Sequence, residues 1–135
     1  MKKLILIFGI LTFSLILTDC SRENESSNSA EIKINPPNWI QGTWLLENPN
    51  TNIGFRFTTN DVVIIQSGAE LSQRGQLELF KNSGQSVSAS NESSENIYKL
   101  ISNFPGGQTT IYSFTKISNT KIKWDAVTNS VYTKQ

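Results

Sequence analysis

The stretch TIYSFTKISNTKIKW, residues 110–124, carries the clearest structural pattern in the chain. Side chains alternate in character between Thr110 and Ile117, and they alternate again over Lys121–Trp124 after the short polar turn Ser118–Thr120. Successive side chains of a β-strand point to opposite faces, so this alternation is typical of strands. Two strands joined by a short turn form a hairpin. We therefore expect a β-hairpin here, followed by a final short strand over Val131–Lys134.

Similar patterns extend upstream to Trp39. Short segments rich in β-branched and aromatic residues are separated by Gly, Asn and Ser about every ten residues, as in an antiparallel sheet. Val62–Ile65 is a continuous apolar run of the kind found in a strand covered on both sides. The strands expected before the hairpin are Trp39–Leu46, Ile53–Thr58, Val62–Ile65 and Gln76–Phe80.

Two further segments leave alternatives open. Asn82–Asn96 is polar and rich in serine, which suits either a long loop or a weak edge strand around Val87. Ser94–Phe104 spaces its apolar residues as an amphipathic helix does, at Ile97, Leu100, Ile101 and Phe104. However, the Pro-Gly-Gly sequence that follows suits a hairpin loop, and the neighbouring segments are strands, so we favour a strand.

Together these segments predict one all-β domain of about seven or eight antiparallel strands over residues 39–135. Residues 20–38 precede it and are rich in Ser, Asn and Glu. Their few sizeable apolar side chains cannot bury enough surface to offset the entropy of ordering. We expect these residues to form a flexible tether, which Pro36-Pro37 stiffens near its end.

Residues 1–19 have the layout of a secretory signal peptide. Met1-Lys2-Lys3 is positively charged, and the apolar run Leu4–Leu17 follows. At 1.5 Å per residue this run covers only about 21 Å, whereas a bilayer core is roughly 30 Å thick, so a permanent transmembrane helix is the weaker interpretation. We expect residues 1–19 to be a targeting segment outside the fold.

Leu17-Thr18-Asp19-Cys20 resembles the lipobox of bacterial lipoproteins, in which a signal peptidase cuts before a lipid-modified cysteine. Asp19 departs from that pattern, which prefers Gly, Ala or Ser there; the alternative is an ordinary signal peptide with an incidental cysteine. The resemblance implies lipid attachment at Cys20, with palmitate among the chains, and anchoring to a membrane. Because Ser21 replaces the Asp that retains enteric lipoproteins at the inner membrane, it implies an outer-membrane lipoprotein of the cell envelope, either periplasmic or surface-exposed.

Composition excludes several classes of function. Without residues 1–19, ten basic and ten acidic residues remain, so no basic field is available for nucleic acid. Cys20 is the only cysteine, and histidine is absent, which removes the usual general base and the commonest metal ligand. The acidic residues are scattered singly and suggest no catalytic pair or cation site. We expect no enzyme, no catalytic residue, no metal and no cofactor.

Gly42-Thr43-Trp44, near the start of the expected domain, resembles the Gly-x-Trp signature of lipocalins, fatty-acid-binding proteins and the wider calycin group. The resemblance implies a small antiparallel up-and-down β-barrel in which Trp44 plugs the closed end and Gly42 allows close backbone approach. Lipocalins often place an arginine across that tryptophan, for which this chain offers only Lys121, Lys123 or Lys134. The alternative is that Gly42-Thr43-Trp44 merely begins a strand of a β-sandwich.

The resemblance implies a site for a small hydrophobic ligand inside the barrel. The candidate lining residues are the expected inward side chains Trp44, Phe55, Phe57, Ile64, Ile111 and Ile122. Aromatic and aliphatic stripes at strand spacing also form ordinary packed cores. The second hypothesis is therefore a non-enzymatic interaction module with a filled core, which docks a partner protein or glycan through loops such as residues 82–96.

Overall fold

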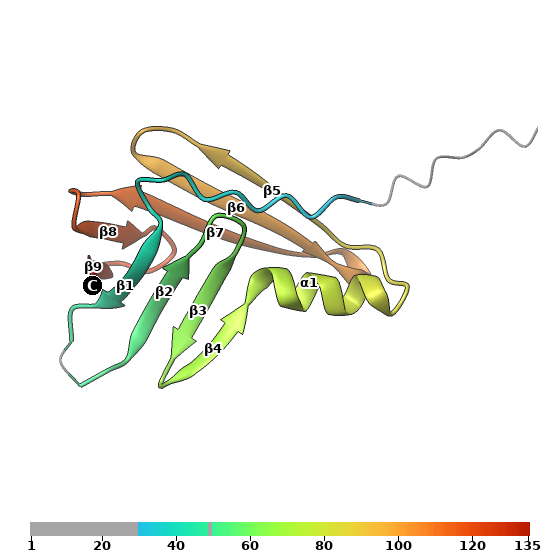
Figure 1. The fold of residues 1–135 in the computed structure, drawn as a ribbon, viewed down its shortest axis with the longest axis horizontal. Helices are drawn as coiled ribbons and strands as arrows, with labels where there is room; N and C mark the ends of the chain where they lie inside the picture. Colours follow the sequence, from blue (N-terminus) through green and yellow to red (C-terminus); the bar gives the residue numbers. More distant parts are fainter. Residues whose placement is uncertain (1–29, 49) are drawn as a thin grey trace, which may run out of the picture.

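The computed structural model describes residues 30–48 and 50–135. The expected signal peptide and Cys20 therefore lie outside the described residues. These described residues form one antiparallel sheet of nine strands, curled into a half-barrel, with one α-helix (Figure 1). The strands are β1 (Gly42–Leu46), β2 (Ile53–Phe57), β3 (Val62–Gln66), β4 (Ala69–Ser72), β5 (Ser88–Ser93), β6 (Ile97–Phe104), β7 (Gln108–Lys116), β8 (Lys121–Trp124) and β9 (Val131–Lys134).

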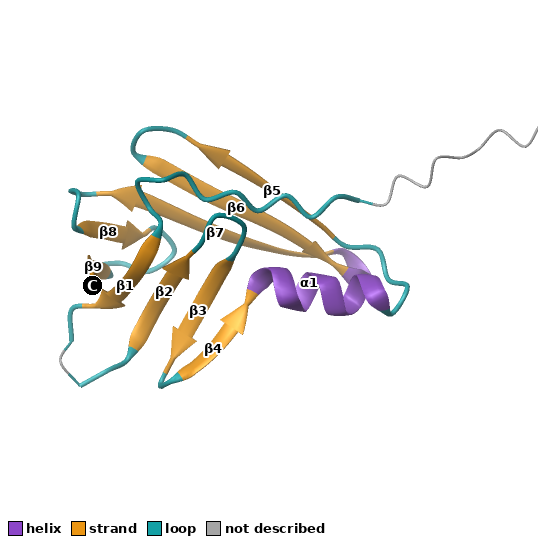
Figure 2. Ribbon diagram, viewed as in Figure 1, coloured by secondary structure: helices purple, strands orange, loops and turns teal. Residues whose placement is uncertain are grey.

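Strand order around the sheet follows chain order, and the first and last strands pair. The sequence β4-β3-β2-β1-β9-β8-β7-β6-β5 leaves one break, between β4 and β5. The helix α1 (Gln73–Asn82) connects these two edge strands, as Figure 2 shows. The all-β, barrel-like prediction is thus confirmed, with nine strands where seven or eight were expected. The strand that no expected segment covered is β4, a four-residue edge strand whose sequence has little β-propensity.

The expected strand Gln76–Phe80 is wrong, because these residues belong to α1. Ser72 caps the helix by accepting a hydrogen bond from the Gly75 amide at 2.8 Å. A second acceptor comes from the β2–β3 turn, where the Asp61 carboxylate accepts from the Arg74 amide at 2.9 Å. The sequence of α1 contains no β-branched residue, and Gln73 and Leu77 are buried one turn apart. Helical propensity and these caps therefore override a short apparent alternation.

The preference for a strand in Ser94–Phe104 is confirmed by β6. The inward side chains of β6 are Tyr98, Leu100 and Ser102, which alternate and are fully buried. Ile97, which contributed to the apparent helical spacing, is 48% exposed on the other face. The edge strand considered around Val87 is also present as β5, although its polar sequence gives it little intrinsic β-propensity.

Both faces of β3 are covered, as its continuous apolar sequence indicated. Val62 belongs to the core, whereas Val63 and Ile65 are buried on the outer face. On that face Arg56 of β2 and Glu70 of β4 form a bidentate ion pair across β3, and both N···O distances are 2.6 Å. The ion pair therefore shields these two apolar side chains, and the guanidinium lowers the pKa of the Glu70 carboxyl.

The folded part of the chain begins before Trp39, the expected boundary. Residues 31–33 run beside β5, where the Lys33 amide donates to the Ala89 carbonyl at 2.9 Å. Ile34 is fully buried in the core, and Figure 1 shows this segment lying along the sheet. The described part of the expected tether is therefore integral to the domain. Ile34 belongs to the core and Ile32, at the alternate position, packs against it, so both isoleucines contribute to holding the segment there.

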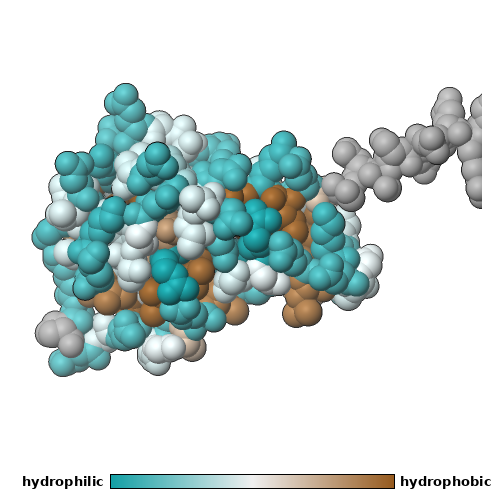
Figure 3. All heavy atoms as spheres, in the orientation of Figure 1, coloured by the Kyte–Doolittle hydropathy of each residue, from teal (hydrophilic) through white to brown (hydrophobic). Residues whose placement is uncertain are grey.

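The core fills the inside of the curled sheet. The outer surface of the domain is mostly polar. Figure 3 shows one face largely covered by hydrophilic side chains, with apolar surface left beside the strands and along α1. Leu71 and Leu79 are among the exposed apolar side chains, at 50% and 71%. None of the helices that the structure describes is long and apolar enough to cross a bilayer.

Candidate hydrophobic site at the open end of the half-barrel

One end of the half-barrel is sealed around Trp44. Its side chain is fully buried, and the indole Nε1 donates to the Ile40 carbonyl at 2.6 Å. Ile40 is itself buried, in the turn that leads into β1. Trp39, beside it, donates from Nε1 to the Ser94 carbonyl at 3.0 Å and thereby ties this turn to the β5–β6 turn. The segment before β1 therefore closes this end.

Lys134 lies over Trp44 at the sealed end. The two residues are register partners in β9 and β1, and the Lys134 ammonium lies 5.1 Å from the centroid of the indole ring. Gly42 makes this geometry possible, because a Cβ there would lie 2.9 Å from Lys134 Cε. Lys134 is thus the one of the three candidate lysines that contacts Trp44. The side chain combines a cation–π contact with packing of its aliphatic stem.

The opposite end contains a small apolar pocket. Its volume is about 200 Å³, and Phe55, one of its lining residues, is only 3% exposed. The Phe55 ring is 5.4 Å from Trp124 and 5.2 Å from Tyr132, measured between ring centroids. The complete lining comes from β2, β3, β7, β8 and β9: Ile53, Gly54, Phe55, Ile64, Ile65, Gln66, Tyr112, Trp124 and Tyr132.

The aromatic wall of the pocket is held from several directions. Tyr112 and Trp124 stack with their ring centroids 6.0 Å apart and an interplanar angle of 26°. Ser130 donates to the Trp124 carbonyl at 2.9 Å, and the Asp125 amide donates to the Ser113 carbonyl at 2.9 Å. These bonds fix the backbone on which the indole is carried. A ligand would therefore meet a largely preformed aromatic surface.

Burial changes the acidity of the pocket tyrosines. It raises the pKa of the Tyr112 phenol and of the Tyr132 phenol, because the phenolate is poorly solvated among apolar neighbours. Both phenols are consequently neutral at physiological pH. Their contribution to the pocket is aromatic surface and neutral hydroxyl groups, without charge.

The six residues expected from the sequence to line a ligand site fall into three groups in the structure: pocket, packed core and outer face. Phe55 and Ile64 line the pocket. Trp44, Phe57 and Ile122 are at most 2% exposed and pack within the core. The expected inward orientation of Ile111 is wrong, since this residue is 51% exposed on the outer face of β7. The reason is that the inward face of β7 carries Tyr112 and Phe114, whose larger apolar areas take precedence in the core.

Among the pocket residues that sequence reasoning missed are its other three aromatic residues, Tyr112, Trp124 and Tyr132. A signal for them existed, because each aromatic residue alternates with polar or smaller neighbours along its strand. The strand positions that these aromatic residues occupy indicate the inward face more reliably than the position of a single isoleucine does. What brings the three together is the pairing of β7 with β8 and of β8 with β9.

Other features of the described residues are weaker candidates for a functional site than the aromatic pocket. A hollow of about 780 Å³ lies on the outer side of the sheet beside the β1–β2 loop, with Leu45, Thr133 and Gln135 in its lining, and it is an open surface groove. Asp125 accepts hydrogen bonds from Ser113 and Thr115, which gives it a structural role. Within residues 30–48 and 50–135, no three His, Cys, Asp or Glu side chains gather as a metal site would require.

Comparison with known proteins gave no match for this chain, whether against family models, curated proteins or solved structures.

Proposed function

We propose that this protein is a lipid-anchored lipoprotein of the cell envelope whose half-barrel binds a small hydrophobic molecule at its open end. The observation that carries the ligand part is the aromatic pocket around Phe55, at the end opposite the Trp44 seal. Such pockets hold their ligands by apolar burial, with few polar contacts. The pocket has no charged lining residue and no acid–base pair, which favours binding over catalysis.

The anchoring part of the proposal rests on the sequence around Cys20. Attachment of two or more acyl chains to this residue would hold the domain stably at a membrane, whereas a single chain gives marginal binding. The test is metabolic labelling with palmitate in a bacterial host, comparing the wild-type chain with Cys20→Ala. Label in the wild type and none in the variant supports the anchor. An unlabelled wild-type protein recovered in the soluble fraction contradicts it.

Ligand binding is best tested on the chain from residue 20 onward with Cys20→Ala, which contains every described residue and needs no detergent. Displacement of a neutral hydrophobic fluorescent probe, N-phenyl-1-naphthylamine, and native mass spectrometry report occupancy. Ile64→Trp places a large ring in the pocket and should abolish probe binding. Ile111→Trp makes the same change on the outer face and is the matched control, which should bind as the parent does. Equal binding by both variants would contradict the proposed site.

The second candidate is an interaction module with a filled core. It is favoured by the pocket's size, because about 200 Å³ is below the roughly 300–1,000 Å³ typical of ligand sites. Under this candidate, a partner protein or glycan docks on the outer surface. The same experiment separates the two candidates, since a filled-core module shows no probe binding to the parent chain and no effect of Ile64→Trp.

A further inference from the structure

A second hollow lies on the inner face of β7, the face that also carries Tyr112 of the aromatic pocket. It has a volume of about 390 Å³ and is lined by Gln76 and Phe80 of α1 and by Phe104, Pro105, Gln108 and Thr110. Thr110 and Tyr112, one lining each hollow, are alternate residues of β7 and therefore point to the same side. Their Cα atoms are separated by about 7 Å, two residues of strand rise. The two hollows are thus neighbours along one surface.

The second hollow is polar but carries no charge. Its polar groups are the amides of Gln76 and Gln108 and the hydroxyl of Thr110. Two buried groups near it have no hydrogen-bond partner within the described part of the chain: Gln76 Nε2, and the hydroxyl of Ser102, which is the register partner of Thr110. Buried polar groups normally bind a partner, so these two offer unused hydrogen-bonding capacity beside the hollow.

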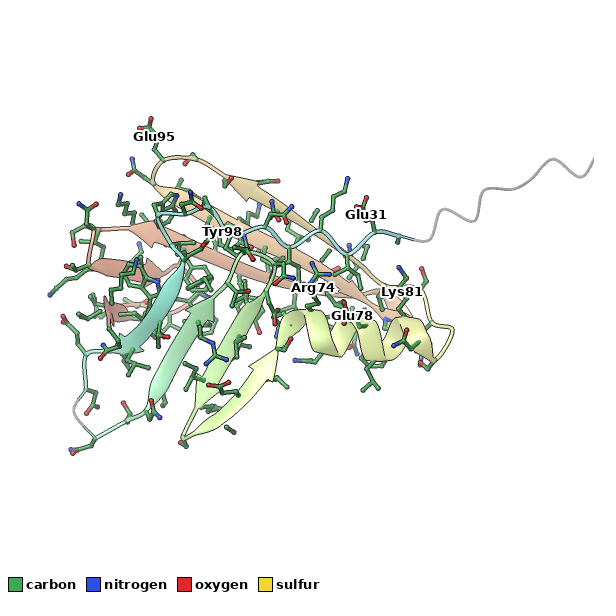
Figure 4. All side chains as sticks on the ribbon, in the orientation of Figure 1. Glu31, Arg74, Glu78, Lys81, Glu95 and Tyr98 are labelled. Carbon is green, nitrogen blue, oxygen red and sulfur yellow. The ribbon has the colours of Figure 1, made fainter. Side chains whose placement is uncertain are left out.

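The charged side chains of α1 lie on its other side. Gln76 and Phe80 are one turn apart, whereas Arg74, Glu78 and Lys81 lie roughly opposite them around the helix at about 100° per residue. Figure 4 shows Arg74 and Glu78 on the side of α1 toward the N-terminal segment. Arg74 donates there to the Asn60 carbonyl at 2.7 Å and lies 3.5 Å from Glu78. A carboxylate placed in either hollow would therefore have no cation in the lining.

From this arrangement we propose that the site selects a neutral single-chain amphiphile with a hydroxyl-bearing head, such as a monoacylglycerol, and disfavours a fatty-acid carboxylate. The hydrocarbon part lies in the aromatic pocket, and the head group hydrogen-bonds with Gln76, Gln108 and Thr110. Burial of an ionised carboxylate without a cationic partner costs far more than burial of a hydroxyl that finds hydrogen bonds. This inference rests on the proposed ligand-binding function and names its ligand class.

The test offers two ligands that share one acyl chain. The Cys20→Ala chain from residue 20 onward is mixed with equal amounts of 1-monooctanoylglycerol and octanoate, whose short acyl chain suits a pocket of about 200 Å³. The mixture is kept at about pH 8, where the free carboxylate is ionised. Native mass spectrometry then measures the ratio of the two complexes. We expect the monoacylglycerol complex to exceed the octanoate complex by at least about tenfold. An equal ratio, or an excess of octanoate, overturns the inference and leaves the proposed function standing. Absence of both complexes overturns both proposals.

Substitutions at the second hollow test whether Gln76 and Thr110 cause the preference for the monoacylglycerol. Gln76→Leu and Thr110→Val remove head-group partners of the monoacylglycerol and should lower the ratio. Thr109→Val, at the adjacent outward position, removes a hydroxyl that donates to Asn103 and should leave the ratio unchanged. Gln76→Lys adds the missing cation and should reverse the preference toward octanoate. Circular dichroism confirms that each variant is folded, and a ratio that none of the inward variants changes contradicts the proposed head-group site.

Discussion

The Lys134 ammonium lies 5.1 Å from the centroid of the Trp44 indole, and this contact joins the last strand to the first. Because β1 and β9 are the strands whose pairing joins the two halves of the sheet, the contact contributes to closure of the curl. Lys134→Met keeps most of the aliphatic stem and removes the charge. We expect it to lower the free energy of unfolding by about 0.5–2 kcal/mol, measured by urea denaturation.

A double-mutant cycle with Trp44→Leu, which removes the aromatic ring, isolates this contact. The single variant Trp44→Leu also removes the hydrogen bond to Ile40, but that loss cancels in the cycle. Additive effects of the two substitutions would show that Lys134 acts without the ring. Lys116→Met is a useful comparison, because Lys116 lies over Trp39, with its ammonium 5.7 Å from the ring centroid, and does not contact Trp44.

Gly54 of β2 lies directly against the backbone of β1. A Cβ at this position would lie 2.0 Å from the Trp44 carbonyl oxygen, a backbone atom that cannot move without disturbing the strand pair. Gly54→Ala should therefore cost at least about 3 kcal/mol of stability, measured by thermal or urea unfolding. Gly84→Ala has open space around the added methyl group and a φ of +82°, so backbone strain should limit its cost to about 1–2 kcal/mol. Similar losses for both variants would contradict this interpretation.

Ile34 tests where the folded domain begins. Its side chain is fully buried although it precedes the expected boundary at Trp39. Ile34→Ala should lower the free energy of unfolding by about 2–4 kcal/mol, as expected for a cavity in the core. Ile111→Ala, which truncates the same type of side chain at an exposed position, should change it by less than about 0.5 kcal/mol. An Ile34→Ala variant as stable as the wild type would place this segment outside the cooperative unit.

The parts of the fold that the sequence predicts are those governed by local alternation. The hairpin of β7 and β8 and the final strand Val131–Lys134 follow directly from period-two patterns. The helix α1 was missed because Leu77 and Leu79 alternate over only a few residues, and because one of its capping acceptors, Asp61, is distant in sequence. Capping across such a distance leaves no local signature.

The candidate site was less predictable than the fold because it depends on how the sheet closes. Phe55 and Ile64 were found from their own strands, which share an unambiguous apolar face. The position of Ile111 required knowing which side of β7 faces inward, and both sides carry apolar residues. The convergence of Tyr112, Trp124 and Tyr132 depends on long-range strand pairing. Strand propensity alone carries no information about that pairing.

The three tyrosines of the chain predict a loss of stability at alkaline pH. Burial raises the pKa of Tyr98, Tyr112 and Tyr132 above the usual value of 10.0, so the folded state binds their protons more tightly than the unfolded state does. Their contribution to stability is fully present below about pH 10 and is lost as the pH rises through the higher folded-state values. Phenolate absorbance near 295 nm should therefore appear above the normal tyrosine range, together with the loss of β-sheet circular dichroism. Titration of all three phenols at the normal pKa in a still-folded protein would contradict their burial. In Tyr112→Phe the phenolate step should be smaller by about one third, and the unfolding transition should shift to higher pH.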